Sequence, residues 1–268
     1  MRSMLFTTVL VLAWAAVAGA DVVVTVEKKD LASDPPAVDT QMIYMAPDKL
    51  SAEGTDGNGG KISMIYRGDR DLIWTIDHAS KSYVEMDRAT MAKMGEQLDA
   101  ALQQMQSQLA QMPEDQRKVV EQMMKDKMGD AAKKKPVVEI QPTSAKQTVA
   151  GKACKRWDVQ VDGVKTAEMW GASWKDAGID KEAFAPFHDL AAFMQSLMDS
   201  SPALANAMAK EGGMFQGLDK VDACPVLIRS YTDGKASEET LFKSVQPGKV
   251  EASRFEVPEG YAKKTLGE

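Results

Sequence analysis

One stretch decides the fold of this chain: Lys61–Asp87, with the sequence KISMIYRGDRDLIWTIDHASKSYVEMD. It contains three short runs in which side chains alternate, Lys61–Tyr66, Leu72–Asp77 and Ser82–Met86, separated by two polar breaks. Alternation with a period of two, in runs rich in β-branched and aromatic residues, is typical of neighbouring antiparallel strands. The stretch therefore predicts a three-stranded meander with one apolar face, which another part of the molecule must cover.

Further strands are expected on both sides of this meander. Before it lie three runs of the same character, Asp21–Lys28, Thr40–Met45 and Lys49–Glu53. Alternation returns after residue 136 and again after residue 224, with Asp-Gly pairs at the sharpest turns, and such pairs are a strong hairpin signal. These runs predict a mainly β protein of the α+β class with about eleven strands, the last of them at Arg254–Val257. Because strands and helices do not alternate one by one, the sheet should be antiparallel.

Two helical insertions interrupt the strands, at about 89–130 and 180–211. In the first, apolar side chains recur at steps of three and four residues, as they do on one face of a helix. They include Met91, Met94 and Leu98. Pro113 followed by two acidic residues is typical of a new helix start, so a kinked helix and a helical hairpin fit this insertion equally well. The second insertion is richer in phenylalanine and is interrupted by Ser-Ser-Pro at 200–202.

The N-terminal residues have the pattern of a secretory signal peptide. Arg2 precedes an apolar run, Met4–Val17, and small residues follow it at 18–20. This is the order of the positive, apolar and cleavage regions of such a peptide. The apolar run is too short for a good membrane span. We therefore expect residues 1–20 to be removed and residues 21–268 to form a single exported domain without a transmembrane anchor.

Composition narrows the classes of function. Of the 268 residues, 44% are hydrophobic and 27% charged, and the formal net charge is −6, which is ordinary for a soluble protein. An acidic chain with scattered basic residues is not expected to bind nucleic acid. The sequence has no nucleophile elbow, zinc-protease motif or phosphate loop, and His78 and His188 lie in a predicted turn and a predicted helix without catalytic context. We expect neither an enzyme nor a bound cofactor or metal.

Cys154 and Cys224 are the only cysteines, and both belong to the part expected to be exported. In an oxidising compartment, such a pair most often forms a structural disulfide. It would close a loop of roughly 70 residues and stabilise the fold by about 4 kcal/mol in the chain-entropy model. We therefore predict a disulfide between these two residues.

The chain also contains 18 methionines, many of them in the predicted helices. Thioether side chains are flexible and polarisable, and they suit a surface that accepts apolar ligands of varied shape. They are equally ordinary packing residues of a core, and a cavity wall is also a core face. Thioethers also bind Cu(I), which leaves a methionine-rich oxidant or copper buffer as a further hypothesis.

Several segments resemble one known family. They are Met64–Asp87, Val149–Val159 with Ala167–Trp170, and Phe255–Tyr261. In their order and in the spacing of the predicted strands, they resemble bacterial periplasmic proteins of the LolA/LolB-like lipoprotein-carrier superfamily, in particular an uncharacterised branch of it. The resemblance implies a curved, unclosed antiparallel half-barrel, with helices across its concave face and an apolar cavity that accepts acyl chains. The methionine-rich insertions and the cysteine pair depart from the carrier's pattern, and its lid-closing arginine has no single counterpart here, so no functional residue is carried over.

The signal peptide and the resemblance together predict a soluble periplasmic binding or carrier protein for an apolar ligand, such as an acyl chain, a lipid or a lipidated protein. From alternation and helix faces we expect ten residues to line its cavity: Met64, Trp74, Ile76, Met91, Met94, Leu98, Trp157, Val159, Phe187 and Phe193. A register error of one residue would exchange the strand members of this set for their neighbours. The alternative is a cell-envelope protein–protein interaction module, whose own helices fill the half-barrel and whose first insertion docks on a partner.

Overall fold

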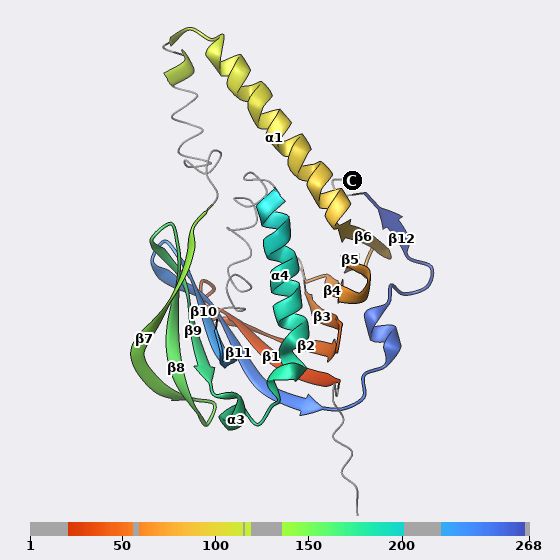
Figure 1. Ribbon diagram of the computed structural model, residues 1–268, viewed down its shortest axis with the longest axis vertical. Coiled ribbons are helices and arrows are strands. Elements are labelled where there is room, and N and C mark those ends of the chain that lie inside the picture. The colour runs from red at the N-terminus through yellow and green to blue at the C-terminus, as the bar shows by residue number, and fades with distance from the viewer. Residues whose placement is uncertain (1–20, 56–58, 115, 119–135, 201–220, 266–268) are drawn as a thin grey trace, which may run out of the picture.

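The main element of the protein is one open, curved sheet of twelve strands (Figure 1). The computed structural model describes residues 21–55, 59–114, 116–118, 136–200 and 221–265. The predicted signal peptide, the part of the first insertion beyond residue 118 and the part of the second beyond residue 200 lie outside these ranges. The sheet confirms the mainly β class, with twelve strands where the sequence indicated about eleven.

The strands follow one another along the chain in two groups. The first group is β1 (Val22–Asp30), β2 (Ala37–Ala46), β3 (Lys49–Thr55), β4 (Lys61–Arg67), β5 (Leu72–Asp77) and β6 (Ser82–Asp87). The second is β7 (Val138–Val149), β8 (Lys152–Val161), β9 (Val164–Ala172), β10 (Cys224–Thr232), β11 (Lys235–Pro247) and β12 (Ala262–Lys264). Across the sheet the order is β12-β6-β5-β4-β3-β2-β1-β11-β10-β9-β8-β7. The first strand therefore joins the two groups by pairing with β11.

Turn chemistry explains two of the tight hairpins of the second group. Asp162 and Gly163 have φ values of 51° and 78°, and Asp233 and Gly234 have values of 51° and 74°. Positive φ at both central residues defines the type I′ turn, whose twist matches that of the flanking strands. The prediction of antiparallel hairpins from Asp-Gly pairs is confirmed at both places.

Helices form a smaller part of the fold. Among the described residues they are α1 (Arg88–Ala110), α3 (Trp174–Ala177) and α4 (Ala185–Ser200), with 3₁₀ turns η1 (Gly68–Arg70), η3 (Lys181–Phe184) and η5 (Ala252–Phe255). α1 starts directly after β6, where the Asp87 side chain accepts a hydrogen bond from the Thr90 backbone N–H, and it extends beyond the sheet (Figure 1). In the described part of the chain, no helix has both the length and the apolar character needed to cross a membrane.

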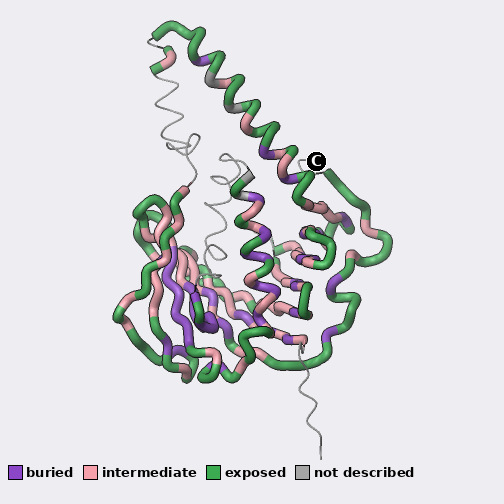
Figure 2. Tube along the Cα trace, viewed as in Figure 1, coloured by how far each residue is buried: buried purple, intermediate pink, exposed green. Residues whose placement is uncertain are grey.

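One face of the sheet, here called the inner face, packs against α4 and the start of α1. The sheet contributes buried side chains that include Val24, Met45, Tyr66, Met169 and Phe242. The helices contribute Met91, Phe187, Leu190 and Phe193. Figure 2 shows buried positions recurring along α4 and along the strands. Since truncating a buried Phe to Ala costs about 3–5 kcal/mol, Phe193, 1% exposed, is a main anchor of α4.

The opposite, outer face is partly covered by the C-terminal segment. Ile65, Trp74 and Ile76 of the sheet pack there against Val250 and Phe255. The strand predicted at Arg254–Val257 is wrong, because this stretch turns through η5 to bury Phe255 instead of pairing with a neighbour. The chain then forms β12, which the sequence did not predict and which pairs parallel to β6.

Arg67 fixes this C-terminal segment to the sheet. Its guanidinium, buried with 4% of the side chain exposed, donates to the Phe255 carbonyl at 3.2 Å and to Glu256 Oε1 at 2.5 Å. It also donates to both carboxylate oxygens of Asp69, and this hydrogen bonding lowers the pKa of Asp69. Because a buried cation is costly unless it is paired, the segment and the sheet depend on each other here.

The predicted disulfide is wrong in this structure, since Cys154 and Cys224 are both free and buried. Cys154 of β8 and Cys224 of β10 each face Ala172 of β9, so a whole strand separates them. Neighbouring strands lie about 4.8 Å apart, which places the two Cα atoms about 10 Å from each other. A disulfide requires less than about 7 Å. Strand order decides this separation, and the spacing of two cysteines in a sequence does not contain it.

Candidate functional site

A cavity of about 570 Å³ opens at one end of the sheet. Its walls come from β7, β8 and β9, from α3 and from the residues just before β10. Trp157, Gly171 and Ala223 supply an apolar floor, and charged side chains from several elements surround it. Trp157 and Ala223 also belong to the inner-face core. The cavity is therefore continuous with the packed interior and open to polar surroundings at its rim.

Gly171 is the residue that shapes the floor. A Cβ atom at this position would lie 2.8 Å from the Ala223 Cβ and 3.1 Å from Cζ3 of Trp157. The first distance is shorter than carbon atoms normally allow and the second is tight, so a side chain larger than that of glycine would push the chain before β10 away from β9. A glycine inside a strand is here the signature of close packing beside a cavity.

Short hydrogen bonds fix the rim of the cavity near α3. Ser173 caps this helix by accepting from the Asp176 N–H at 3.0 Å, and its hydroxyl donates to the Asp176 carboxylate at 2.7 Å. Asp222 accepts from Lys181 Nζ at 2.7 Å and from the indole N–H of Trp174 at 3.0 Å. The hydrogen bonds from Lys181 and Trp174 lower the pKa of the Asp222 carboxyl, so this carboxylate is charged and already has donors.

Most of the ten predicted cavity residues share one face but form a packed core. Six lie in the inner-face core: Met64, Met91, Met94, Trp157, Phe187 and Phe193. Val159 is buried on the same face, opposite Ile140 of β7 and Ala167 of β9. Of the ten, only Trp157 lines the cavity. The prediction thus found the correct face at these seven positions and assigned six packing residues to a cavity wall.

Three predicted positions are wrong. Trp74 and Ile76 point to the outer face, because the β4–β5 pairing sets Trp74 opposite Ile65 and Ile76 opposite Ser63. An even-numbered residue of β4, such as Met64, shares its face with odd-numbered residues of β5. Leu98 is 36% exposed on α1, a helix that extends beyond the sheet (Figure 1).

The other residues that line the cavity were not predicted from the sequence. Gly171 had a usable signal, because a glycine in a strand interior indicates a close backbone approach. Lys146 and Lys155 carried no signal of their own, because their pairing depends on the register between β7 and β8. Ala223 carried none either, since its place beside β9 depends on strand order.

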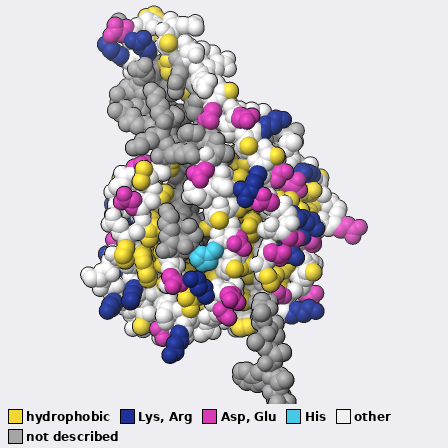
Figure 3. Space-filling model, viewed as in Figure 1, with side chains coloured by type: hydrophobic (Ala, Val, Ile, Leu, Met, Phe, Trp, Pro, Cys, Tyr) yellow, Lys and Arg dark blue, Asp and Glu magenta, His cyan; other side chains and the backbone are white. Residues whose placement is uncertain are grey.

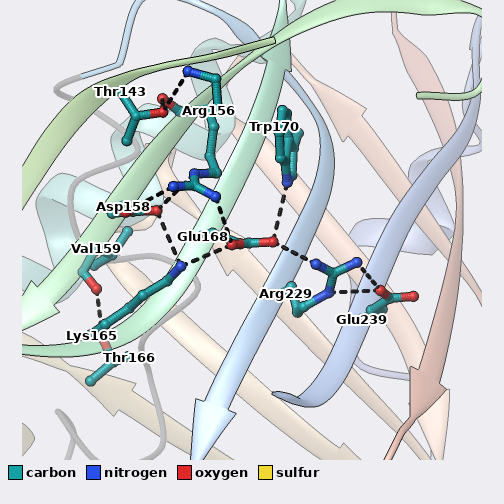
Figure 4. A network of polar contacts seen from close by, with 11 residues as sticks. Thr143, Arg156, Asp158, Val159, Lys165, Thr166, Glu168, Trp170, Arg229 and Glu239 are labelled. Carbon is teal, nitrogen blue, oxygen red and sulfur yellow. Dashed lines mark hydrogen bonds and ion pairs between the residues drawn. The ribbon is translucent and has the colours of Figure 1, made fainter. Parts of the chain in front are cut away.

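A polar network lies on the outer face of the sheet (Figure 4). Glu168, 3% exposed, accepts from Arg229 at 2.6 Å, from Lys165 at 2.9 Å and from the Trp170 indole at 3.3 Å. Burial alone would raise the pKa of Glu168, but hydrogen bonds led by the one from Lys165 hold it below its ordinary value. Asp158 and Glu239 add further carboxylates to the same cations. Cations and carboxylates are equal in number in this network. It therefore stabilises the sheet and has no unpaired charge to offer a ligand.

His78 takes part in a second polar contact that the sequence did not indicate. Its Nε2 lies 2.8 Å from Ser63 Oγ, and its Nδ1 lies 3.0 Å from the Tyr261 hydroxyl. The arrangement has the order of a nucleophile, a base and an orienting group. However, Ser63 is 6% exposed, and Tyr261 belongs to the segment that leads into β12. The contact therefore joins the C-terminal segment to the β4–β5 hairpin.

No model of a known protein family matches this chain, and no curated protein sequence matches it either. The features of this protein that point to a function are therefore the sheet, the cavity and the charges around it.

Proposed function

We propose that this protein is an exported, periplasmic binding or carrier protein for an apolar or amphipathic small ligand, such as an acyl chain, a lipid or a lipidated protein. The single observation that carries the proposal is the cavity of about 570 Å³ beside Trp157. Small-molecule sites typically enclose about 300–1,000 Å³ and combine an apolar floor with a few polar groups. The curved sheet and the helix on its inner face agree with the half-barrel that the LolA/LolB-like resemblance implies.

Burial of apolar surface would supply the affinity. Each buried methylene contributes about 0.8 kcal/mol, which corresponds to about fourfold tighter binding per methylene. The affinity of a homologous series of fatty acids should therefore rise with chain length and then level off when the cavity is full. Surface adsorption would give a shallow rise without a plateau.

Native mass spectrometry of residues 21–268, purified without detergent, tests the proposal. We expect an adduct of lipid mass that dissociates on activation, or one that forms on incubation with fatty acids below their micellar concentration. Ala153→Phe places a ring in the cavity from an exposed strand position and should abolish the adduct. Ala37→Phe, at an exposed position of β2, is the matched control and should retain it. A clean apo mass for the unmodified protein under all these conditions would refute the carrier proposal.

One observation favours the alternative of an envelope interaction module. α1 extends beyond the sheet and is largely exposed (Figures 1 and 2), with Leu98 36% exposed and Met112, just after its end, 39% exposed. Charged side chains of both signs are interspersed over the face visible in Figure 3, which gives a polyanion no extended basic surface there. The interaction module becomes the better account if two results are obtained together. The native mass stays apo, and Leu98→Glu, at unchanged stability, fails to restore a growth phenotype that the unmodified protein restores in cells lacking it.

A further inference from the structure

Two lysines face each other on one wall of the cavity. Lys146 of β7 pairs directly with Lys155 of β8, and both line the cavity. Like charges directly opposite each other on antiparallel strands repel and destabilise the sheet. Both side chains are exposed, so water screens this repulsion. An anion bound between the two ammonium groups would remove it.

The described part of the chain supplies no such charge to these two side chains. Some lysines elsewhere on the protein have close carboxylate partners: Lys28, Lys181, Lys243 and Lys263 each lie within 2.8 Å of a carboxylate oxygen. Lys146 and Lys155 have no ion-pair partner among the described residues. The carboxylates at the opposite rim of the cavity already accept hydrogen bonds, Asp222 from Lys181 and Asp176 from Ser173.

An apolar surface lies directly beside this cationic wall. Lys155 and Trp157 are two positions apart on β8, so their side chains are on the same face, with Cα atoms about 7 Å apart. The indole of Trp157 borders Gly171 and Ala223 on the cavity floor. A ligand that satisfied both surfaces would carry a negative group at one end and an apolar body next to it.

We propose that the cavity binds an amphipathic anion, a carboxylate or phosphate ester attached to an apolar chain. Its oxyanion lies between Lys146 and Lys155 and accepts charge-assisted hydrogen bonds from both ammonium groups. Its apolar body lies against Trp157. This inference rests on the proposed function and adds the chemical class of the ligand and the two side chains that select it.

Calorimetric titration of residues 21–268 tests the inference with four probes: decanoate, decyl phosphate, decanol and inorganic phosphate. The two amphipathic anions should bind about tenfold more tightly than decanol, or about threefold for each exposed lysine. In the Lys146→Gln/Lys155→Gln variant this advantage should disappear, while binding of decanol is unchanged. Added salt should weaken the anions selectively, because exposed charges are screened.

A matched control removes the same net charge elsewhere. Lys235→Gln/Lys264→Gln changes two exposed strand lysines outside the cavity and should leave every affinity as it was. The cavity variant should fold at least as stably as the unmodified protein, because it removes a repulsive pair, and its thermal midpoint checks this.

The possible outcomes separate the inference from the proposed function. If decanol binds as tightly as decanoate, the protein is an apolar carrier and the head-group assignment is overturned. If inorganic phosphate binds as tightly as decyl phosphate, the site takes a free anion and the amphipathic assignment is overturned. If none of the four probes binds, the proposed function fails together with the inference.

Discussion

Gly171→Ala tests the packing that forms the cavity floor. The added Cβ would lie 2.8 Å from the Ala223 Cβ, an atom fixed to the backbone, so the β9 chain or the residues before β10 must move. Overpacking of this kind costs about 1–3 kcal/mol. The less flexible unfolded chain of an alanine variant returns about 0.4–1 kcal/mol. We therefore expect a net destabilisation of about 1–2 kcal/mol.

Urea unfolding followed by circular dichroism measures this change as a lower midpoint at an unchanged slope. Gly248→Ala is the matched control, because a Cβ there meets nothing within 4 Å, and this variant should be as stable as the unmodified protein or slightly more so. Ala223→Gly removes the closest clashing atom, so Gly171→Ala should cost less than about 1 kcal/mol in that background. Equal costs of Gly171→Ala in both backgrounds would refute the argument from close approach.

The other predictions concern the outer face and the cysteines. Glu168→Gln removes the buried carboxylate that half-buried Lys165 and Arg229 share and should lower the free energy of unfolding at pH 7 by about 1.5–3 kcal/mol. Because the fold lowers the pKa of Glu168 from its ordinary 4.5, this stabilisation is lost as the pH falls through the lowered pKa, so the urea midpoints of the two proteins should converge as the pH is lowered below 4.5. Burial raises the pKa of Cys224 to about 11, so iodoacetamide at pH 8 should label Cys154 and Cys224 only after unfolding, and the intact mass should show two free thiols; a mass two protons lower would contradict the strand order. Trp74→Ala should lower stability and leave ligand binding intact, whereas Trp157→Ala should weaken binding in the titrations described above.

Local sequence patterns predicted the elements of this fold well. The alternation in Lys61–Asp87 marked β4, β5 and β6 within a residue of their ends, and the Asp-Gly pairs marked two hairpins. Side chains alternate in a strand and recur every 3.6 residues in a helix because of backbone geometry alone, so these patterns need no knowledge of the rest of the chain. The same patterns placed Trp157 and Val159 on the face that proved to be the inner one.

The candidate site was predicted much less well, because it depends on pairing between distant segments. The face of Trp74 depends on the parity of the β4–β5 register, which the turn at η1 sets. The cavity floor depends on Ala223 reaching Gly171 across more than fifty intervening residues, and the cationic wall depends on Lys146 facing Lys155. Each of these contacts joins residues whose own neighbours in sequence give no hint of it.

By itself, the sequence determined that this chain forms a mainly antiparallel sheet with two helical insertions, because strand and helix periodicities and turn preferences are local properties of the backbone. Only the tertiary structure decided which faces are covered, that β9 separates Cys154 from Cys224, and that two unpaired lysines lie beside an apolar floor. The physical reason is that strand order and register are set by the burial of the whole sheet, to which every strand contributes at once.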